Sequence, residues 1–278
     1  MPTTEVPNIT LSDGVDIPQL GFGVFQIPPE DTVEATLRAF EAGYRHIDTA
    51  KAYQNEAEVG QGFRAAALDR DDVFITTKCF NTDHGYNQAK DAFKASLERL
   101  ELDFVDLYLI HWPVPSNDLY VETWKAFVEL KEEGVVRSIG VSNFQPAHLA
   151  RIVDETGVTP SVNQIELHPY FQQQGLRREH GDRGIVTEAW SPIAQGKVLD
   201  DPVLTAIAEE HGKTTGQVAL RWHIQLGNVV FPKSVTPERI VENFDIFDFH
   251  LSEDEMSRIE ELDAGDRTGP DPDTFIAP

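Results

Sequence analysis

Four side chains with complementary acid–base chemistry stand at, or shortly after, the ends of three strand-like segments. Asp48 ends the segment 46–48, and Tyr53 follows it closely. Lys78 comes two residues after the segment 73–76 ends, and His111 follows the segment 105–110. The pKa of a tyrosine is about 10, which is too high for efficient proton donation at neutral pH. A nearby ammonium stabilises the phenolate and lowers that pKa, while a carboxylate keeps the ammonium charged and in place.

A histidine beside such a group can hydrogen-bond a carbonyl and fix its orientation, so the set indicates proton transfer to a carbonyl oxygen. Each residue also has a purely structural interpretation. Asp48 could cap a helix, His111 could pack in a loop before Trp-Pro, and Tyr53 could be a half-buried aromatic. Lys78 is harder to explain in this way, because burying an unpaired ammonium is costly. The occurrence of all four at consecutive strand ends favours catalysis.

The elements that must position these residues alternate between strand-like and helix-like patterns. Eight short apolar runs predict strands at 19–22, 46–48, 73–76, 105–110, 136–141, 162–165, 185–187 and 229–231. Apolar residues at helical spacing predict helices at 31–42, 87–100, 119–133, 206–211, 216–226, 237–244 and 252–262. Before them, residues 9–17 predict a hairpin that turns at Asp13-Gly14.

Eight strands alternating with helices is typical of a (β/α)₈ TIM barrel, here of the α/β class with an N-terminal β-hairpin. The alternative is a doubly wound nucleotide-binding sheet. That fold agrees less well, because Gly21-Phe22-Gly23 stops short of the G-x-G-x-x-G fingerprint. No linker-like break divides the chain, so we expect one domain over residues 1–278.

The composition excludes several classes of function. The 278 residues contain 47 Asp+Glu against 23 Lys+Arg, a net charge of −24, which argues against a nucleic-acid partner. No apolar run approaches the roughly 20 residues that span a bilayer. The first ten residues lack the pattern of a secretory signal, so we expect a cytoplasmic protein without a membrane contact. A single cysteine, Cys79, excludes internal disulfides, and the histidines show no ligand spacing such as H-E-x-x-H, so no metal is expected.

The acidic residues are spread along the chain rather than gathered in a tail. Their mutual repulsion opposes a compact fold in dilute buffer. At about 1 M salt the Debye length falls to about 3 Å, and this repulsion is screened. The sequence therefore predicts a halophilic protein that works in a high-salt cytoplasm.

The motifs around these residues resemble those of a known family. The stretch Gly43-Tyr44-Arg45-His46-Ile47-Asp48-Thr49-Ala50, followed by Tyr53 and Asn55-Glu56, is similar to the first signature of the aldo-keto reductases. Residues 101–118, 139–144, 163–166 and 231–234 resemble further signatures of that family. The segments 22–26, 163–169 and 230–235 are most similar to its bacterial 2,5-diketo-D-gluconate reductase branch. The resemblance implies that Asp48, Tyr53, Lys78 and His111 are catalytic, with Tyr53 as general acid in the reduction of aldehydes and ketones.

The sequence also indicates a phosphate site near the last strand. Residues 233–236 lead directly into a helix that begins near Pro237 and carries Arg239. Phosphate sites in barrels commonly follow the seventh and eighth strands and use a helix amino terminus. A lysine, a hydroxyl and an arginine suit a dianionic phosphate. The alternative is ordinary capping, with surface ion pairs to Glu238 and Glu242.

The resemblance implies that NADPH/NADP⁺ is the cofactor and that the site prefers it to NADH. The residues implied for the cofactor extend from the nicotinamide to the 2′-phosphate and the adenine. They are Ser142, Asn143 and Gln164 for the carboxamide, Trp190 and Ser191 beside the ring, Lys233, Ser234 and Arg239 for the phosphate, and Glu242 and Asn243 for the adenine.

Aromatic residues near the strand ends predict an apolar wall for a small-molecule carbonyl substrate. The candidates are Phe22, Phe25, Phe80 and Trp112, with Tyr170 as a further one. The tail 263–278 is expected to be too short to fold over this wall as a large loop. Together these features predict tolerance for small aldehydes, α-dicarbonyls or keto-sugars, in a protein expected to be a monomer.

Two other functions remain open from the sequence. A barrel of this kind could bind NADPH without catalysis and regulate a partner protein, which the intact set of four residues argues against. An aldolase-type barrel could instead use Lys78 as a Schiff-base amine.

Overall fold

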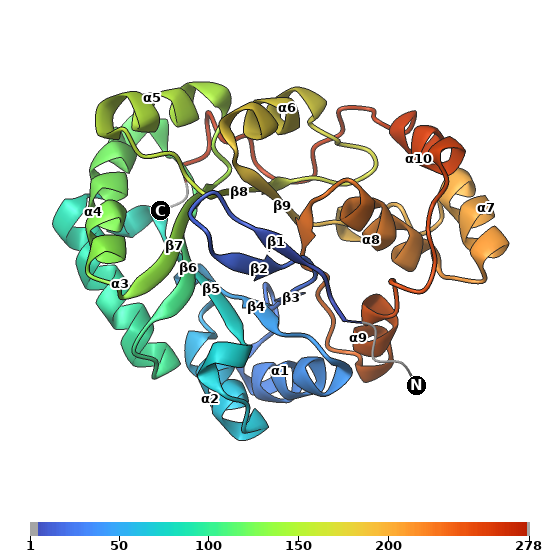
Figure 1. The fold of residues 1–278 in the computed structure, drawn as a ribbon, viewed down its shortest axis with the longest axis horizontal. Coiled ribbons are helices and arrows are strands. Elements are labelled where there is room, and N and C mark those ends of the chain that lie inside the picture. The colour runs from blue at the N-terminus through green and yellow to red at the C-terminus, as the bar shows by residue number, and fades with distance from the viewer. Residues whose placement is uncertain (1–4, 277–278) are drawn as a thin grey trace.

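Eight parallel strands form a closed barrel in the computed structural model, which describes residues 5–276 (Figure 1). The strands are β3 (Phe22–Gly23), β4 (His46–Asp48), β5 (Phe74–Cys79), β6 (Val105–Ile110), β7 (Val136–Ser142), β8 (Val162–Glu166), β9 (Val186–Trp190) and β10 (Val229–Val230). Each strand pairs with the next one along the chain. The ring closes where Leu20 bridges Val230 in parallel orientation, with Gly21 N–H donating to the Val230 carbonyl at 2.9 Å. The expected TIM barrel is confirmed.

Helices cover the outside of the strands (Figure 1). They are α1 (Pro29–Ala42), α2 (Glu56–Ala66), α3 (Tyr86–Leu100), α4 (Tyr120–Glu132), α5 (Pro146–Thr156), α6 (Gln174–Arg183), α7 (Pro202–His211), α8 (Thr215–Gln225), α9 (Pro237–Phe244) and α10 (Glu253–Glu260). Three of them, α2, α5 and α6, are not among the helices expected from the apolar spacing. In α6 the reason is composition, because Leu176 is its one buried apolar residue and the other side chains are mostly polar. In α2 the interior glycine Gly60 is required by packing, since a Cβ there would lie 2.2 Å from the Leu100 carbonyl oxygen of α3.

The expected hairpin is present as β1 (Asn8–Thr10) and β2 (Asp16–Pro18), and it closes the end of the barrel at which the strands begin. In the turn, Asp13 accepts hydrogen bonds from the Ser138 and Ser161 hydroxyls at 2.8 and 2.9 Å and from Lys131. Burial raises the pKa of the Asp13 carboxyl, but these donors outweigh it and the pKa is lowered. Leu11 and Ile17 of the hairpin segment pack into an apolar cluster with residues of the barrel interior, including Leu107. The chemistry must therefore lie at the opposite end.

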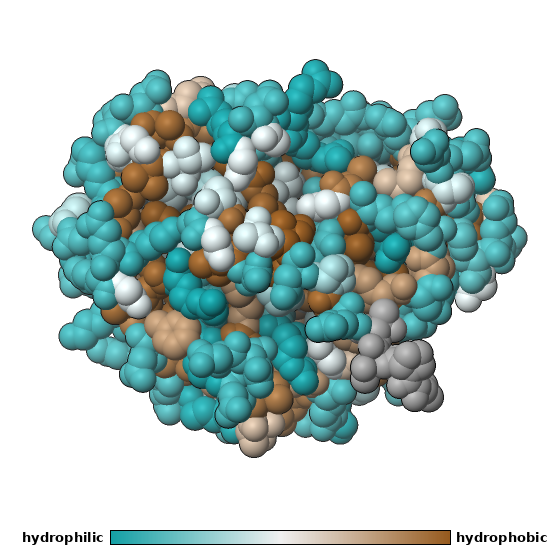
Figure 2. Space-filling model, viewed as in Figure 1, coloured by the Kyte–Doolittle hydropathy of each residue, from teal (hydrophilic) through white to brown (hydrophobic). Residues whose placement is uncertain are grey.

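Hydrophilic residues cover most of the helical layer on the hairpin face, and apolar surface is concentrated near the centre (Figure 2). Within residues 5–276 no helix has both the length and the apolar character needed to cross a bilayer. The first four residues of the segment in which we expected no secretory signal lie outside the described part of the chain.

Candidate active site

A buried chain of hydrogen bonds joins three of the four expected catalytic residues. Lys78 on β5 is fully buried, and its Nζ donates to Asp48 Oδ1 on β4 at 2.7 Å and to the Thr49 carbonyl at 3.0 Å. The same ammonium lies 3.2 Å from the hydroxyl oxygen of Tyr53. Tyr53 ends a single 3₁₀ turn, Lys51–Tyr53, which follows β4 and is fixed by the bond from Tyr53 N–H to the Ala50 carbonyl. Neighbouring parallel strands thus bring these three groups to one rim.

The pKa of Tyr53 differs from the expectation that Lys78 would lower it. Burial raises the pKa of Tyr53, and although Lys78 lowers it both by charge and by hydrogen bonding, burial prevails and the pKa is raised. Burial lowers the pKa of Lys78, but Asp48 and Tyr53 outweigh it, so that pKa is raised as well. The lysine is therefore a permanent cation, and its effect on Tyr53 is to limit the penalty for forming a phenolate.

A permanently charged, fully buried lysine is a poor amine nucleophile. Schiff-base formation requires the neutral amine, whereas the Lys78 ammonium is hydrogen-bonded to a carboxylate, a carbonyl and a phenol. The aldolase alternative is not supported by this geometry.

His111, directly after β6, completes the set of four. Its ring centre lies 5.7 Å from that of Tyr53, nearly perpendicular to it. Burial, assisted by the charge of Lys78 and by His84, keeps the pKa of His111 well below its ordinary value. The ring is therefore neutral at physiological pH, and one nitrogen can donate a hydrogen bond while the other accepts.

Gln164 on β8 extends the buried network to a residue that the sequence interpretation missed. Its side-chain amide nitrogen donates to Asp48 Oδ2 at 2.8 Å and to Glu188 Oε2 at 2.9 Å. Glu188 lies on β9 and is fully buried. A signal was present in the sequence, since Glu188 is an acid inside a predicted barrel strand, two residues before Trp190.

The residues expected around a nicotinamide are linked to one another at the same rim. Ser142 donates to the Gln164 carbonyl at 2.8 Å, and Asn143 donates to the Ser142 hydroxyl and to the His111 carbonyl at 3.0 Å. The indole N–H of Trp190 donates to the Asn143 side-chain oxygen at 2.9 Å. Ser191 follows at φ 51°, a left-handed conformation that turns the chain away from β9. These polar groups are held in fixed positions before any ligand binds.

The residues expected around a 2′-phosphate also lie together, after β10 and at the start of α9. Ser234 is buried, and its hydroxyl accepts from Thr236 N–H at 3.0 Å, which shapes the approach to the helix. Lys233 and Arg239 are exposed. Neither has an ion-pair partner within residues 5–276, so the alternative of surface pairs with Glu238 and Glu242 is not observed.

Two further residues expected on the adenine side are partly exposed on α9. Glu242 accepts a hydrogen bond from the Thr214 hydroxyl at 2.8 Å, and Asn243 is its neighbour in the helix.

Three of the predicted wall residues lie beside Tyr53 or His111. Phe25 is 54% exposed, with its ring centre 5.0 Å from that of Tyr53. Phe80 and Trp112 lie 5.9 and 6.5 Å from the His111 ring. Phe22 does not belong with them: it is buried and packs edge-on against Tyr44, between the barrel and the helices. The period of two along a strand explains the error, because Gly23 shares the register and face of Asp48 while Phe22 points outward.

The expectation for the C-terminal tail was wrong. After α10 the chain crosses the end of the barrel opposite the hairpin (Figure 1). Thr268 Oγ1 and Gly269 N–H donate to the buried carboxylate of Glu166 at 2.6 and 3.0 Å. Gly269 lies so close to Trp190 that a Cβ on it would be 2.4 Å from the indole ring. The ring of Phe275 then packs against Trp112 at 4.3 Å, so the short tail supplies part of the apolar wall.

Tyr170, the further candidate, has a different role. Its hydroxyl donates to Asp201 at 2.8 Å, and its carbonyl accepts from Ala264 and Asp266 of the tail.

Comparison with known proteins shows similarity to reductases over nearly the whole chain. Residues 19–264 match the model of the aldo/keto reductase family. An aldo-keto reductase of Mycolicibacterium smegmatis is 58% identical over 269 residues, covering 97% of this chain and 98% of that protein. The methylglyoxal reductase DkgA of Escherichia coli K12 is 52% identical over 269 residues, covering 96% and 97%. The crystal structure of a Gox0644 mutant in complex with NADPH has a TM-score of 0.94 at 48% identity, covering 98% of this chain and 99% of that one.

These findings confirm the expected class of reaction, an NADPH-dependent reduction of a carbonyl group. They also fit the expected similarity to the bacterial branch that contains DkgA. The chain belongs to the aldo/keto reductase family.

Proposed function

We propose that this enzyme reduces small aldehydes and α-dicarbonyl compounds, methylglyoxal among them, and that Tyr53 is the proton donor. The observation that carries the proposal is the Asp48–Lys78–Tyr53 chain of hydrogen bonds beside a neutral His111. NADPH supplies the hydride when bound. Tyr53 donates its proton to the carbonyl oxygen as negative charge develops there, and the Lys78 ammonium, 3.2 Å away, stabilises the phenolate that remains.

Asp48 and His111 support this step in different ways. Asp48 holds the Lys78 ammonium in place and keeps it charged. A ring N–H of the neutral His111 can donate to the same carbonyl oxygen and orient it. Because both partners are fixed before the substrate arrives, little reorganisation is needed during the reaction.

The residues that would hold NADPH fit a phosphorylated dinucleotide. Ser142, Asn143 and Gln164 offer polar groups for a carboxamide beside the indole of Trp190, and Ser191 begins the loop that follows. Lys233 and Arg239 have no ion-pair partner among residues 5–276 of a chain whose net charge is −24, which suits a dianionic 2′-phosphate next to Ser234. Glu242 and Asn243 lie on the same helix and would face the adenine.

The apolar wall supports a compact substrate. Phe25 lies beside Tyr53, Phe80 and Trp112 lie beside His111, and the tail residue Phe275 packs on Trp112. A short carbonyl compound can therefore reach Tyr53 along an apolar wall of rings. The activity named for the E. coli relative, methylglyoxal reductase, supports an α-dicarbonyl substrate. Keto-sugars, including 2,5-diketo-D-gluconate, are the more polar alternative.

The test is the rate of NADPH oxidation with methylglyoxal, with short aldehydes and with 2,5-diketo-D-gluconate. Tyr53→Phe should abolish turnover and leave the Kd of NADPH, measured by tryptophan fluorescence, unchanged. Tyr120→Phe is the matched control, because Tyr120 is buried at the start of α4 and packs against Phe144 and His148, not against the proposed catalytic residues. Turnover retained by Tyr53→Phe would refute the role of Tyr53, and preference for the keto-sugar would refute the substrate class.

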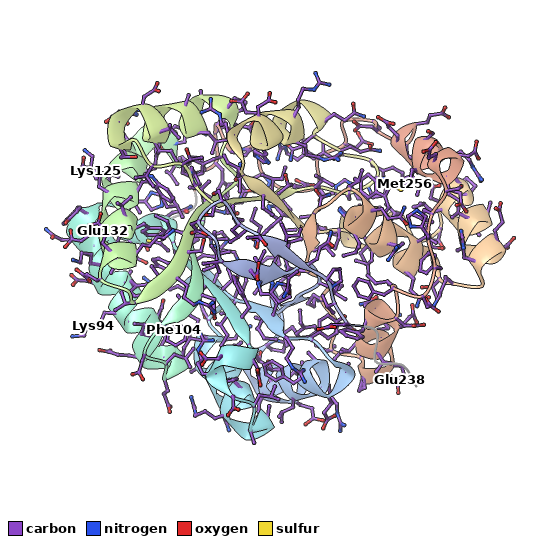
Figure 3. The ribbon with its side chains drawn as sticks, viewed as in Figure 1. Lys94, Phe104, Lys125, Glu132, Glu238 and Met256 are labelled. Carbon is purple, nitrogen blue, oxygen red and sulfur yellow. The ribbon has the colours of Figure 1, made fainter. Side chains whose placement is uncertain are left out.

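We also propose that the enzyme is a monomer with a single domain and that it works in a cytoplasm of high salt concentration. The charge of −24 supports it, as do helix surfaces on which charged side chains such as Lys94, Lys125 and Glu132 point outward from α3 and α4 (Figure 3). The single-domain organisation is supported by the hairpin and the tail, which both pack on the barrel. Size-exclusion chromatography with light scattering at low and molar KCl tests the monomeric state.

A further inference from the structure

A second carboxyl group lies inside the barrel beside the catalytic one and has no place in the mechanism above. Glu188 of β9 is in register with Gln164 of β8 and Val229 of β10. It is fully buried; its Oε2 accepts from Gln164 at 2.9 Å, and its Oε1 has no hydrogen-bond partner within residues 5–276. Glutamates are almost never fully buried without a charged partner, so this one requires an explanation.

The charges around Glu188 favour its protonated form. Asp48 of β4 and Lys78 of β5 are the charged groups that act on it, and the adjacent strands present the uncharged Gln164 and Val229. The single cation is already engaged by Asp48 at 2.7 Å. Burial chiefly, and then the Asp48 charge, raise the pKa of Glu188 to about 8. At neutral pH the cluster of Asp48, Lys78 and Glu188 therefore holds one carboxylate, one ammonium and one carboxylic acid.

We propose that Glu188, in its protonated form, is a positioning residue for proton donation by Tyr53, acting through Gln164 and through the net charge of the buried cluster. This inference rests on the proposed role of Tyr53 and adds to it a requirement for a second, neutral carboxyl group.

The first part of the argument is geometric. The amide nitrogen of Gln164 has two N–H bonds, and Asp48 and Glu188 accept one each. With both bonds made, the amide cannot turn over, and its carbonyl oxygen must face away from the two carboxyl groups. The same contacts hold Asp48 Oδ2, while Asp48 Oδ1 holds Lys78. Removing the acceptor at position 188 would leave an N–H unpaired in the interior, which is costly.

The second part concerns charge. With Tyr53 and Glu188 protonated, the charges of Asp48 and Lys78 cancel. Proton donation by Tyr53 leaves one net negative charge in the cluster. When Tyr53 takes up a proton from solvent, the net charge of the cluster returns to zero. If Glu188 has already lost its proton, the same step must build a second negative charge in the barrel interior, so Tyr53 becomes a weaker acid. The reduction must therefore slow as Glu188 ionises.

The experiment compares the pH profiles of kcat for carbonyl reduction in the wild type, Glu188→Gln and Glu188→Ala. The wild-type kcat should fall as the pH rises through about 8. Glu188→Gln keeps an acceptor for Gln164 but cannot ionise, so it should retain the neutral-pH kcat and lose the decline. Glu188→Ala should lose about tenfold in kcat at neutral pH, the effect of one buried hydrogen bond. Glu255→Gln, a buried acid of α10 that accepts from the Ser252 cap, is the matched control and should keep the wild-type profile.

The outcomes separate this inference from the proposed function. A wild type that fails to oxidise NADPH with any carbonyl compound refutes the function itself. An active wild type whose alkaline limb is shared by Glu188→Gln overturns the role of Glu188, as does a Glu188→Ala enzyme with unchanged kcat. If the variants fail to fold, infrared spectroscopy of the wild type decides. A protonated carboxyl band should persist at pH 7 and vanish at pH 10, and its absence at pH 7 would overturn the inference.

Discussion

Replacing Lys78 by methionine tests the central electrostatic claim about this site. The substitution keeps the length and apolar stem of the side chain but removes the charge that lies 3.2 Å from the Tyr53 hydroxyl. With an effective dielectric constant of about 20, a unit charge at this distance stabilises a full phenolate by about 5 kcal/mol. If about half of the proton charge has moved in the transition state, the loss is about 2.5 kcal/mol, or roughly a hundredfold in kcat.

The same substitution leaves Asp48 as a buried carboxylate without its cation. Breaking a buried ion pair from one side costs about 3–5 kcal/mol of stability. The double variant Asp48→Asn/Lys78→Met removes both charges and should recover much of that stability, measured by chemical unfolding, without recovering kcat.

The assay is steady-state NADPH oxidation with saturating methylglyoxal, together with the Kd of NADPH. We expect kcat to fall about a hundredfold while the Kd stays within about twofold, because Lys233 and Arg239, the residues proposed to bind the 2′-phosphate, lie after β10, away from Lys78. A Lys78→Met enzyme with kcat within about threefold of the wild type would refute the reasoning, since the ammonium would then not stabilise the phenolate.

Three other predictions follow from the charges of the molecule. Lys233→Ala should raise the KM of NADPH by about ten- to a hundredfold and leave that of NADH unchanged, whereas Lys94→Ala, an exposed lysine of α3, should change neither. For Glu188, whose pKa is raised from 4.5 to about 8 by burial, wild-type stability must fall as the pH rises from about 4.5 to about 8 and then level off. Glu188→Gln should thus raise the Tm at pH 9 but not at pH 4, and an equal effect at both would contradict the assignment. Finally, the Tm of the wild type should rise between dilute buffer and molar KCl, because screening relieves the repulsion of a −24 chain; a flat response would count against salt adaptation.

The amino-acid sequence by itself determined the order of the eight barrel strands and the set of four residues at the rim. In a parallel barrel every strand ends on the same side. Residues that close successive strands, such as Asp48, Lys78 and His111, must therefore meet whatever the details of packing. The hairpin turn at Asp13-Gly14 is also predictable from the sequence, because it depends on the turn preference of these two neighbouring residues.

Side-chain direction was harder to predict, because a strand alternates its faces with every residue. Phe22 and Gly23 differ by one position, and only the register against β4 shows that Gly23 shares the face of Asp48. The helices α2 and α6 were missed for a related reason. The glycines of α2 are explained only by their close contacts with neighbouring elements, and α6 buries a single apolar residue, Leu176.

What only the tertiary structure decided depends on contacts between residues far apart in the chain. Glu188 reaches Asp48 through Gln164 because the barrel closes, and the tail reaches Trp112 and Trp190 because Glu166 binds its backbone. The balance of acid strength is also a tertiary property. A sequence shows that a lysine can lower the pKa of Tyr53, but desolvation depends on everything that surrounds the hydroxyl, and here burial outweighs the lysine. The spacing of the strands along the sequence places Asp48, Tyr53, Lys78 and His111 at one rim. The closed barrel buries these side chains, and this burial shifts the pKa values of Tyr53, Lys78 and His111.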